Sequence, residues 1–140
     1  RAVVVRLGGI YGPERTSLVR RLHEGNAFAP AAGPRYQNRI HRDDCARSLR
    51  HLALLPEPQS VYLGVDDEPA DLGQVQAWLC ARLGIDPTAL RPAPPSARGA
   101  NKRCSNARLR EAGVELAYPS YRDGYCELVE GLRKSGKASG

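Results

Sequence analysis

The sequence has 140 residues, of which 41% are apolar and 26% are charged, and this composition is typical of one globular domain rather than of a disordered chain. No apolar stretch reaches the roughly 18 to 20 residues that a membrane-spanning helix needs, and the first residues lack the pattern of a secretory signal. We therefore expect a soluble cytoplasmic protein that does not associate with a membrane.

The net charge of +6 is distributed unevenly along the chain. Residues 1–51 hold ten arginines against four acids, residues 52–90 one arginine against six acids, and residues 91–140 ten basic residues against five acids. No run of like charge is long, and aromatic residues do not alternate with basic ones as a surface for stacking nucleic-acid bases requires. The pattern disfavours nucleic acid as a partner and favours a solvated surface with a few arginines around a ligand.

The four cysteines carry no metal-binding pattern. Cys45, Cys80, Cys104 and Cys126 include no Cys-x-x-Cys pair, and no histidine lies at a metal-ligand spacing from them. We expect no metal site. Because Cys45 and Cys80 fall on predicted helices, we expect reduced thiols rather than disulfides.

The first element that we predict is a buried strand over residues 2–7. Its β-branched run AVVV is typical of a parallel sheet that is covered on both faces. The sequence GGIYGP then ends the strand. A short helix follows over residues 15–24, because Leu18, Val19 and Leu22 share one face and Gly25 stands where a helix C-terminus favours glycine.

The segment NRIH, residues 38–41, predicts a short extended piece that leads into a longer helix. We expect Asp43 to cap this helix and Pro56 to end it. Its expected apolar face consists of Ala46, Leu49, Leu52 and Ala53. The sequence SVYLGV, residues 60–65, predicts a second buried strand, and the acidic turn DDEP follows it.

The second half of the chain is mostly helical by pattern. Asp71 and Gln74 resemble a capping box for a helix that Gly84 ends. Its apolar stripe consists of Leu72, Val75, Trp78, Leu79 and Leu83. Residues 85–103 contain four prolines and predict an irregular loop. Short helices are expected over residues 105–110 and from Ser120 onward, and residues 133–140 are expected to be a disordered tail.

The alternation of strands and helices indicates the α/β class, but only two strands are convincing. Two strands do not make a stable parallel sheet, so residues 3–5 suit a sheet whose other strands come from elsewhere. The chain contains no methionine and begins with Arg1, from which we expect that it is not a complete translation product.

Four segments taken together resemble the C-terminal part of the extended short-chain dehydrogenase/reductase family, also called NAD-dependent epimerases/dehydratases. They are RLGGIYGPER, NRIHRDDCARSL, VYLGVDDEP and KRCSNARLREAGVELAYPSYRDGY. The branch that the chain resembles most is that of nucleoside-diphosphate-sugar epimerase-like proteins. The resemblance implies that residues 1–140 form one unit, the C-terminal part of a Rossmann-like, NAD(P)-binding fold together with the small substrate-binding lobe.

The resemblance further implies that the complete protein binds NAD or NADP through a glycine-rich turn and uses a Tyr-x-x-x-Lys pair, both in its N-terminal half. Neither motif is present here. None of the six tyrosines is followed by lysine four residues later, and Gly9-x-x-Gly12 is not followed by a third glycine. We therefore expect that the chain holds no catalytic residue, binds no cofactor tightly by itself and is inert without the missing N-terminal half.

The resemblance places cofactor and substrate at the end of the first strand. The implied cofactor-contacting residues are Leu7, Gly8, Gly9 and Tyr11. The resemblance places Gly12 and Pro13 in the loop beyond, on the substrate side. Further candidates for contact with an anionic group of the substrate are Arg35, Arg39, Arg42, Lys102 and Arg103. A tight turn that leaves a strand explains the glycines equally well. For Lys102 and Arg103, the sequence favours a solvated loop over contact with a ligand.

The expected substrate is a small molecule, either a nucleotide sugar or another carbinol or carbonyl compound. Gly9 stands where many sugar-nucleotide epimerases have a substrate-contacting asparagine, and Gln37 where they have a phosphate-binding arginine, so these positions disfavour a nucleotide sugar. Two other hypotheses stay open. One is a basic adaptor that binds nucleic acid or an acidic partner, and the other is a cofactor-free relative that uses the fold as a scaffold.

Overall fold

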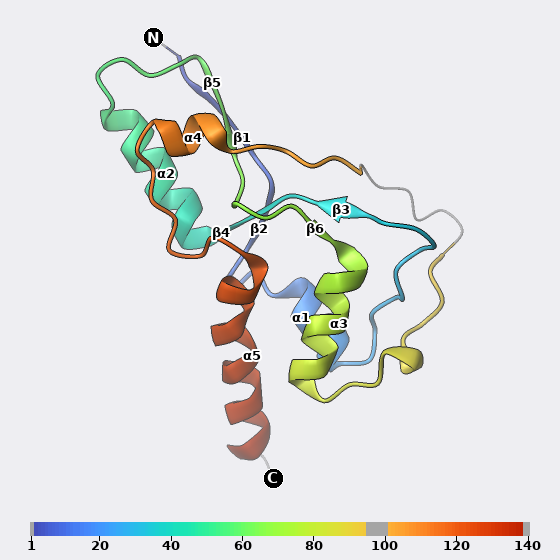
Figure 1. Ribbon diagram of the computed structural model, residues 1–140. Helices are drawn as coiled ribbons and strands as arrows, with labels where there is room; N and C mark the ends of the chain where they lie inside the picture. Colours follow the sequence, from blue (N-terminus) through green and yellow to red (C-terminus); the bar gives the residue numbers. More distant parts are fainter. Residues whose placement is uncertain (1, 95–100, 139–140) are drawn as a thin grey trace.

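The computed structural model describes residues 2–94 and 101–138 of the chain (Figure 1). The strands are β1 (Val4–Leu7), β2 (Gly9–Tyr11), β3 (Tyr36–Gln37), β4 (Arg39–His41), β5 (Val61–Gly64) and β6 (Ala70–Asp71). The helices are α1 (Ser17–His23), α2 (Arg42–Leu54), α3 (Leu72–Leu83), α4 (Ala107–Glu111) and α5 (Tyr121–Ala138), with a 3-10 turn at Pro87–Ala89. None of the described helices is long and apolar enough to cross a membrane.

The strands pair two by two in the described part of the chain. β1 pairs in parallel with β5, β2 pairs in parallel with β4, and β3 pairs antiparallel with β6. β1 and β2 are consecutive and are separated only by Gly8, so one extended segment changes its partner from β5 to β4 at this glycine. The parallel pairs confirm the predicted α/β class.

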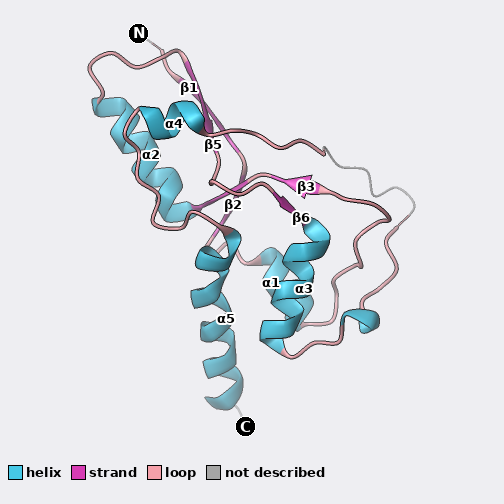
Figure 2. Cartoon of the chain, viewed as in Figure 1, coloured by secondary structure: helices cyan, strands magenta, loops and turns pink. Residues whose placement is uncertain are grey.

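The helices gather at two ends of the molecule. Figure 2 shows α2 and α4 beside β1 and β5 at one end, and α1, α3 and α5 at the other, with the remaining short strands between them. We call the first group the strand region and the second the helical lobe. Each has its own hydrophobic core.

In the strand region, α2 and α4 cover one face of the β1–β5 pair. The core consists of Leu52, Tyr62, Leu109 and Val114, against which Val3 and Val5 pack. Side chains alternate between the faces of a strand, so Val4 lies on the opposite face from Val5. Val4 is 50% exposed, and the described residues therefore leave that face of the pair largely uncovered.

In the helical lobe, α1, α3 and α5 pack against one another around a larger core. It contains Tyr11, Val19, Leu22, Ala27, Ala70, Val75, Leu79, Cys80, Tyr121, Tyr125 and Val129. The ring of Trp78 meets that of Tyr121 edge to face at 5.8 Å between centroids. Gly84 ends α3 in the left-handed conformation, with φ of 70°, as the sequence predicts.

Helix α2 begins and packs differently from the sequence-based expectation. His41 caps it, because its Nδ1 accepts the Asp43 N–H (3.0 Å), so the prediction that Asp43 is the cap was wrong. Its buried face consists of Asp44, Cys45, Ser48 and Leu52. The predicted apolar face was wrong except at Leu52, because Ala46, Leu49 and Ala53 are exposed, Leu49 by 44%. The reason is that Asp44 turns inward to accept the N–H groups of Ala117 and Tyr118, both at 2.8 Å.

Two other expectations about helix ends need correction. Asp71 makes no capping bond to α3, because its Oδ1 accepts the N–H of Arg35 (2.7 Å) instead. Helix α5 continues to Ala138, so the prediction of disorder was wrong for residues 133–138, and residues 139–140 lie outside the described residues. Leu128 and Leu132, in the turns just before these residues, pack against the core of the lobe.

Candidate functional site

Three segments of the chain meet where the parallel strands end. The Gly8 N–H donates to the carbonyl of Gly64 (3.1 Å), and the Gly9 N–H donates to the carbonyl of Asn38 (3.0 Å). The Asp66 N–H in turn donates to the carbonyl of Arg39 (2.7 Å). In open α/β sheets, ligands bind outside the carboxyl ends of the strands and at points where the strand pairing changes. The junction at Gly8 and Gly9 has both properties.

The two glycines at this junction differ in what surrounds them. A Cβ at Gly8 would lie 2.8 Å from the Asn38 carbonyl oxygen and 3.0 Å from Val65 Cγ1, so packing within the chain requires glycine there. A Cβ at Gly9 would have only the same carbonyl oxygen nearby, at 3.6 Å, which is an ordinary contact. Gly9 is also exposed, and its lack of a side chain leaves the strand end accessible.

A short segment, residues 101–104, lies against this junction, and we call it the strap. The Asn38 Nδ2 donates to the carbonyl of Lys102 (2.9 Å), and the Cys104 N–H donates to Asn38 Oδ1 (2.9 Å). Nearby, the Tyr36 N–H donates to Asn101 Oδ1 (2.7 Å). Residues that are about 65 positions apart in the chain are thereby brought together.

The strap places two predicted substrate-contacting residues beside the strand end. Lys102 and Arg103 are exposed, and the Arg103 guanidinium lies over the ring of Tyr36 at 3.6 Å from its centroid. This geometry is that of a cation–π contact, which holds the guanidinium in place while its edge stays open to a ligand. Arg35, another predicted contact, is half-buried and directly precedes Tyr36.

Two other predicted substrate-contacting residues are used inside the chain. Arg39 is 5% exposed, and its Nη2 donates to Gln37 Oε1 (3.1 Å). Its Nη1 is buried and has no hydrogen-bond partner among the described residues. Arg42 Nη1 donates to the Pro13 carbonyl (3.0 Å), and its Nε contacts Asp43 Oδ1 at 3.2 Å. Both arginines thus hold parts of the fold together.

Tyr11, Gly12 and Pro13 follow the junction on β2 and the turn after it. Tyr11 is 5% exposed, its ring lies 4.5 Å from that of Tyr125, and its hydroxyl donates to the Ser120 carbonyl (3.4 Å). Burial raises the pKa of Tyr11 far above its ordinary range, so the phenol keeps its proton at neutral pH. Gly12 has φ of 145°, which favours glycine, and Pro13 is exposed.

The structure also places buried polar groups near the junction that the sequence analysis did not single out. Asp66 is 2% exposed, its Oδ1 accepts the Glu68 N–H (3.0 Å), and its Oδ2 has no partner among the described residues. Burial, the largest cause, raises the pKa of Asp66 to about 7 against the lowering effects of the Glu68 N–H and Arg39. Its position directly after a buried strand was the signal that could have identified it.

His41 is neutral in this setting. Burial lowers its pKa, and its Nδ1 accepts a backbone N–H, which requires the unprotonated nitrogen. Its ring stacks on Tyr118 at 3.8 Å between centroids. The helix cap and the stacked ring together account for the position of His41 without a ligand.

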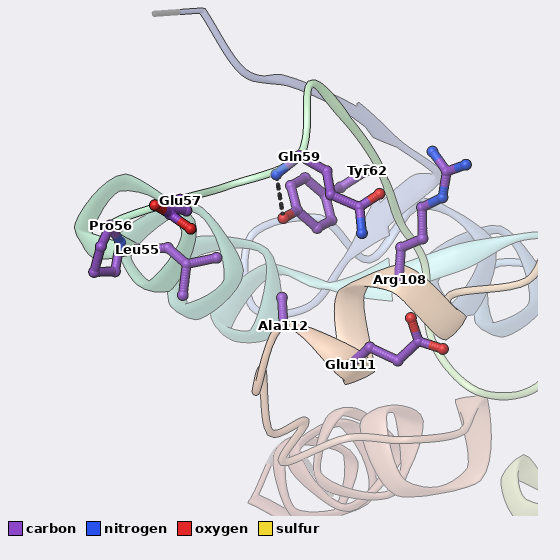
Figure 3. A pocket seen from close by; sticks show the side chains of 8 residues that line it. All are labelled: Leu55, Pro56, Glu57, Gln59, Tyr62, Arg108, Glu111 and Ala112. Atoms are coloured by element: carbon purple, nitrogen blue, oxygen red, sulfur yellow. Dashed lines mark hydrogen bonds between the residues drawn. The ribbon is translucent and has the colours of Figure 1, made fainter.

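Two surface hollows lie apart from the strand junction. One, of about 510 Å³, lies between the end of α2 and α4, with Tyr62 at its floor (Figure 3). Leu55, Pro56 and Glu57 line one side of it, and Arg108 and Glu111 project from α4 on the other. It adjoins the start of β5 rather than the carboxyl end. A second hollow of about 440 Å³ lies against α3 and α5, beside Trp78 and Tyr118.

Within the described ranges, no group of three or more histidine, cysteine, aspartate or glutamate side chains is placed to hold a metal ion. Cys45 and Cys80 are buried, and Cys104 and Cys126 are half-buried. For both buried thiols, burial is the main cause that raises the pKa, which makes them poor nucleophiles.

No family model matches the chain, and no curated protein matches it. Solved structures do. Over 94% of its length the chain matches a protein from Methylobacillus flagellatus that is proposed to be an NAD-dependent epimerase/dehydratase, at 33% identity and a TM-score of 0.75. A human epimerase family protein with NADPH matches at 22% identity over 94% of the chain, and the UDP-glucose 4-epimerase of Thermotoga maritima with UDP-glucose at 21% over 95%, both with a TM-score of 0.76.

The chain spans about half the length of these proteins, namely 47%, 49% and 46% of theirs. The two matches near 20% identity show the shared Rossmann-like fold. The Methylobacillus protein adds a closer likeness in sequence. The chain belongs to the extended short-chain dehydrogenase/reductase family of NAD-dependent epimerases/dehydratases and corresponds to the C-terminal portion of its members, as its motifs predict.

Proposed function

We propose that this chain forms the substrate-side wall of the active-site cleft of an NAD(P)-dependent epimerase/dehydratase-like oxidoreductase. The observation that carries the proposal is the convergence at one strand end of an open glycine backbone, at Gly9, and a cationic strap with Lys102 and Arg103. An accessible backbone allows close approach of a planar ring, and fixed cations favour an anionic substrate group.

On the cofactor side, we assign Leu7, Gly8 and Gly9 to contact with the nicotinamide. The residues fit such a group, because Leu7 is 38% exposed at the strand end and Gly9 presents no side chain that would fill the space. NAD or NADP, when bound, accepts or supplies a hydride at the substrate carbon. The groups that hold the rest of the cofactor and transfer the proton are assigned to sequence outside this chain.

On the substrate side, we assign Lys102, Arg103 and Arg35 to an anionic group such as a phosphate. The fixed guanidinium of Arg103 suits bidentate binding to phosphate or carboxylate oxygens. The Thermotoga neighbour was solved with UDP-glucose, which supports a phosphorylated carbinol or carbonyl compound as the substrate class. Arg39, Arg42, Tyr11, Gly12 and Pro13 are assigned to shaping the cleft wall, because their polar groups bind within the chain or form its turn.

We further propose that the chain is inert alone and works with an N-terminal half that carries the cofactor motif and Tyr-x-x-x-Lys. The open edge of β1 supports this, since β1 pairs only with β5 among the described residues and Val4 on its uncovered face is 50% exposed. Parallel sheets are normally covered on both faces. The half-buried and buried reduced cysteines suit a cytoplasmic location, which we keep as part of the proposal.

The alternative of a basic adaptor has weaker support. Arginines 39, 42, 47, 110 and 122 make hydrogen bonds or ion pairs within the chain and are not free to form a continuous basic surface. The described structure also shows no aromatic platform along the remaining basic residues other than Tyr36 beside Arg103 and Trp78 beside Arg82.

Titration of the isotope-labelled chain with inorganic pyrophosphate, followed by NMR, tests the proposal. We expect shifts confined to the amides of Gly9, Tyr36 and Arg103, and an affinity at least fivefold weaker in a Lys102→Ala/Arg103→Ala variant. An Arg108→Ala variant serves as control, because Arg108 is exposed beside the unrelated hollow. Shifts around Tyr62 instead of Gly9, or equal affinity in both variants, would contradict the assignment.

A further inference from the structure

Asn38, between β3 and β4, contacts both parts of the proposed site at once. Its side-chain amide donates to the Lys102 carbonyl and accepts the Cys104 N–H, each at 2.9 Å. Its backbone carbonyl accepts the Gly9 N–H at 3.0 Å. One residue therefore fixes the distance between the strap and the strand end.

Within residues 2–94 and 101–138, the strap makes few contacts besides those with Asn38. Residues 101–104 belong to no described strand or helix, and α4 begins only at Ala107. Beyond Asn38, the strap is held by the Asn101 bond to the Tyr36 N–H and by the stacking of Arg103 on the Tyr36 ring. On its C-terminal side, the Asn106 Nδ2 donates to the Val65 carbonyl (3.0 Å) and to Asp67 Oδ1 (2.7 Å).

The chemistry at position 38 requires an amide. The strap presents a carbonyl at Lys102 and an N–H at Cys104, and a short side chain with both a donor and an acceptor satisfies the two together. Aspartate can accept the N–H but cannot donate to the carbonyl when ionised, and alanine can do neither. Through these two bonds, Asn38 of the segment NRIH binds Lys102 and Cys104 of the segment KRCSN, so two motifs that lie far apart in the sequence contact each other in the fold.

We propose that Asn38 is a positioning residue, which holds Lys102 and Arg103 over the strand end at Gly9 and so sets the strength of anion binding without touching the anion. The structural part of this inference stands on the hydrogen bonds above. The part that concerns the anion rests on the proposed function.

Three variants of the full chain test the proposal. Asn38→Ala removes both strap bonds, and Asn38→Asp keeps only the acceptor for the Cys104 N–H. Asn26→Ala is the matched control, because Asn26 is an exposed asparagine whose Oδ1 accepts one bond from the described residues, from Arg91 Nη2 at 3.4 Å. The two readouts are hydrogen exchange at the Cys104 amide and affinity for inorganic pyrophosphate, with the thermal midpoint recorded for each variant.

In Asn38→Ala we expect the Cys104 amide to exchange at least tenfold faster, and in Asn38→Asp we expect its protection to be retained. Pyrophosphate affinity should fall roughly tenfold in Asn38→Ala, the range expected for the loss of two hydrogen bonds. Asn26→Ala should leave both quantities at their wild-type values. A merely structural role would lower the thermal midpoint and raise exchange throughout the chain, whereas positioning raises exchange at the strap alone.

The two proposals fail in different ways. If the wild-type chain does not bind pyrophosphate but Asn38→Ala frees the Cys104 amide, the proposed function fails and the positioning of the strap by Asn38 stands. If Asn38→Ala leaves Cys104 exchange unchanged, or changes it no more than Asn26→Ala does, the positioning role is overturned whatever the affinity. If Asn38→Ala unfolds the chain, Asn38→Asp decides: wild-type exchange at Cys104 supports the role, and tenfold faster exchange refutes it.

Discussion

The helical lobe and the strand region are built from the same chain but bury their apolar residues to different extents. In the lobe, Val75 and Leu79 on α3 are fully buried, and α3 contacts both α1 and α5. In the strand region, the β1–β5 pair is covered by α2 and α4 on one face, and Val4 on the other is half exposed. An amphipathic helix buries its one apolar face against a single partner. A strand inside a parallel sheet is buried only when it has a neighbouring strand on each side and a covering layer on each face.

The difference predicts where this chain resists change and where it depends on other sequence. The lobe should behave as a closed core by itself. The outer face and free edge of β1 should respond little to substitution in this chain alone, and strongly once a covering segment is present.

The largest expected effect compares one core position in each setting. Leu79→Ala should lower the free energy of unfolding by about 3 to 4 kcal/mol, because Leu79 is 0% exposed in the lobe core. Val4→Ala should lower it by less than about 0.5 kcal/mol, since half of Val4 already faces water. Urea denaturation of both variants measures the difference. Equal losses would show that the outer face of β1 is covered in solution.

The next prediction concerns the link between α2 and the segment before α5. Asp44→Ala should cost about 2 to 3 kcal/mol, because it leaves the N–H groups of Ala117 and Tyr118 without their acceptor. Its neighbour provides the control: Asp43 is 45% exposed, so Asp43→Ala should cost under about 0.5 kcal/mol. Thermal unfolding of the two variants measures the difference in stability. A larger loss of stability in Asp43→Ala than in Asp44→Ala would contradict the prediction.

At the junction of the two regions, the pH dependence of stability depends on Asp66. Its pKa is about 7 in the fold and 3.8 as a free side chain, so the folded state binds the proton more tightly. Stability from this group is present below about pH 4 and is lost as the pH rises towards 7, with a change of a few kcal/mol.

Burial lowers the pKa of His41, so its contribution has the opposite sign and is lost as the pH falls below its ordinary value of 6.5. Asp66→Asn should therefore remove the loss of stability between pH 4 and 7 and leave the His41 effect. Urea midpoints measured across this pH range check the sign. An unchanged profile in Asp66→Asn would show that Asp66 is ionised in the fold.

The smallest effect compares two glycines of α5. A Cβ at Gly124 would overlap the ring of Tyr11, so Gly124→Ala should destabilise the chain by about 1 to 2 kcal/mol despite the better helix propensity of alanine. Gly131 has nothing within 4 Å of such a Cβ, so Gly131→Ala should stabilise the chain by roughly 0.5 to 1 kcal/mol. Differential thermal unfolding resolves the two signs, and a stabilising Gly124→Ala would show that Tyr11 packs elsewhere.

Much of the secondary structure follows from local pattern. The apolar stripe of α3 and its end at Gly84 are readable from the sequence, because a helix records its buried face every three to four residues. The cap and inward face of α2 are not. Asp44 is buried because Ala117 and Tyr118, more than 70 residues further on, supply the N–H groups that it accepts.

The candidate site divides in the same way. Glycines after a β-branched run mark the strand end, and Lys102 and Arg103 are candidates for ligand contact from their place after the proline-rich loop. The sequence does not distinguish Gly8 from Gly9, or exposed arginines from buried ones. Arg39 and Arg103 are the same residue type, and the sequence alone does not show which of the two is buried. One is 5% exposed beside Gln37, and the other is exposed over Tyr36.

The sequence by itself determined the α/β class, the positions of the main helices and the family, because periodicity, turn residues and the order of motifs can be read directly from the chain. Only the tertiary structure decided which polar residues are buried, that Asn38 connects the strap to Gly9, and that β1 keeps one open face. These features depend on contacts between residues far apart in the chain, which no short window of sequence contains.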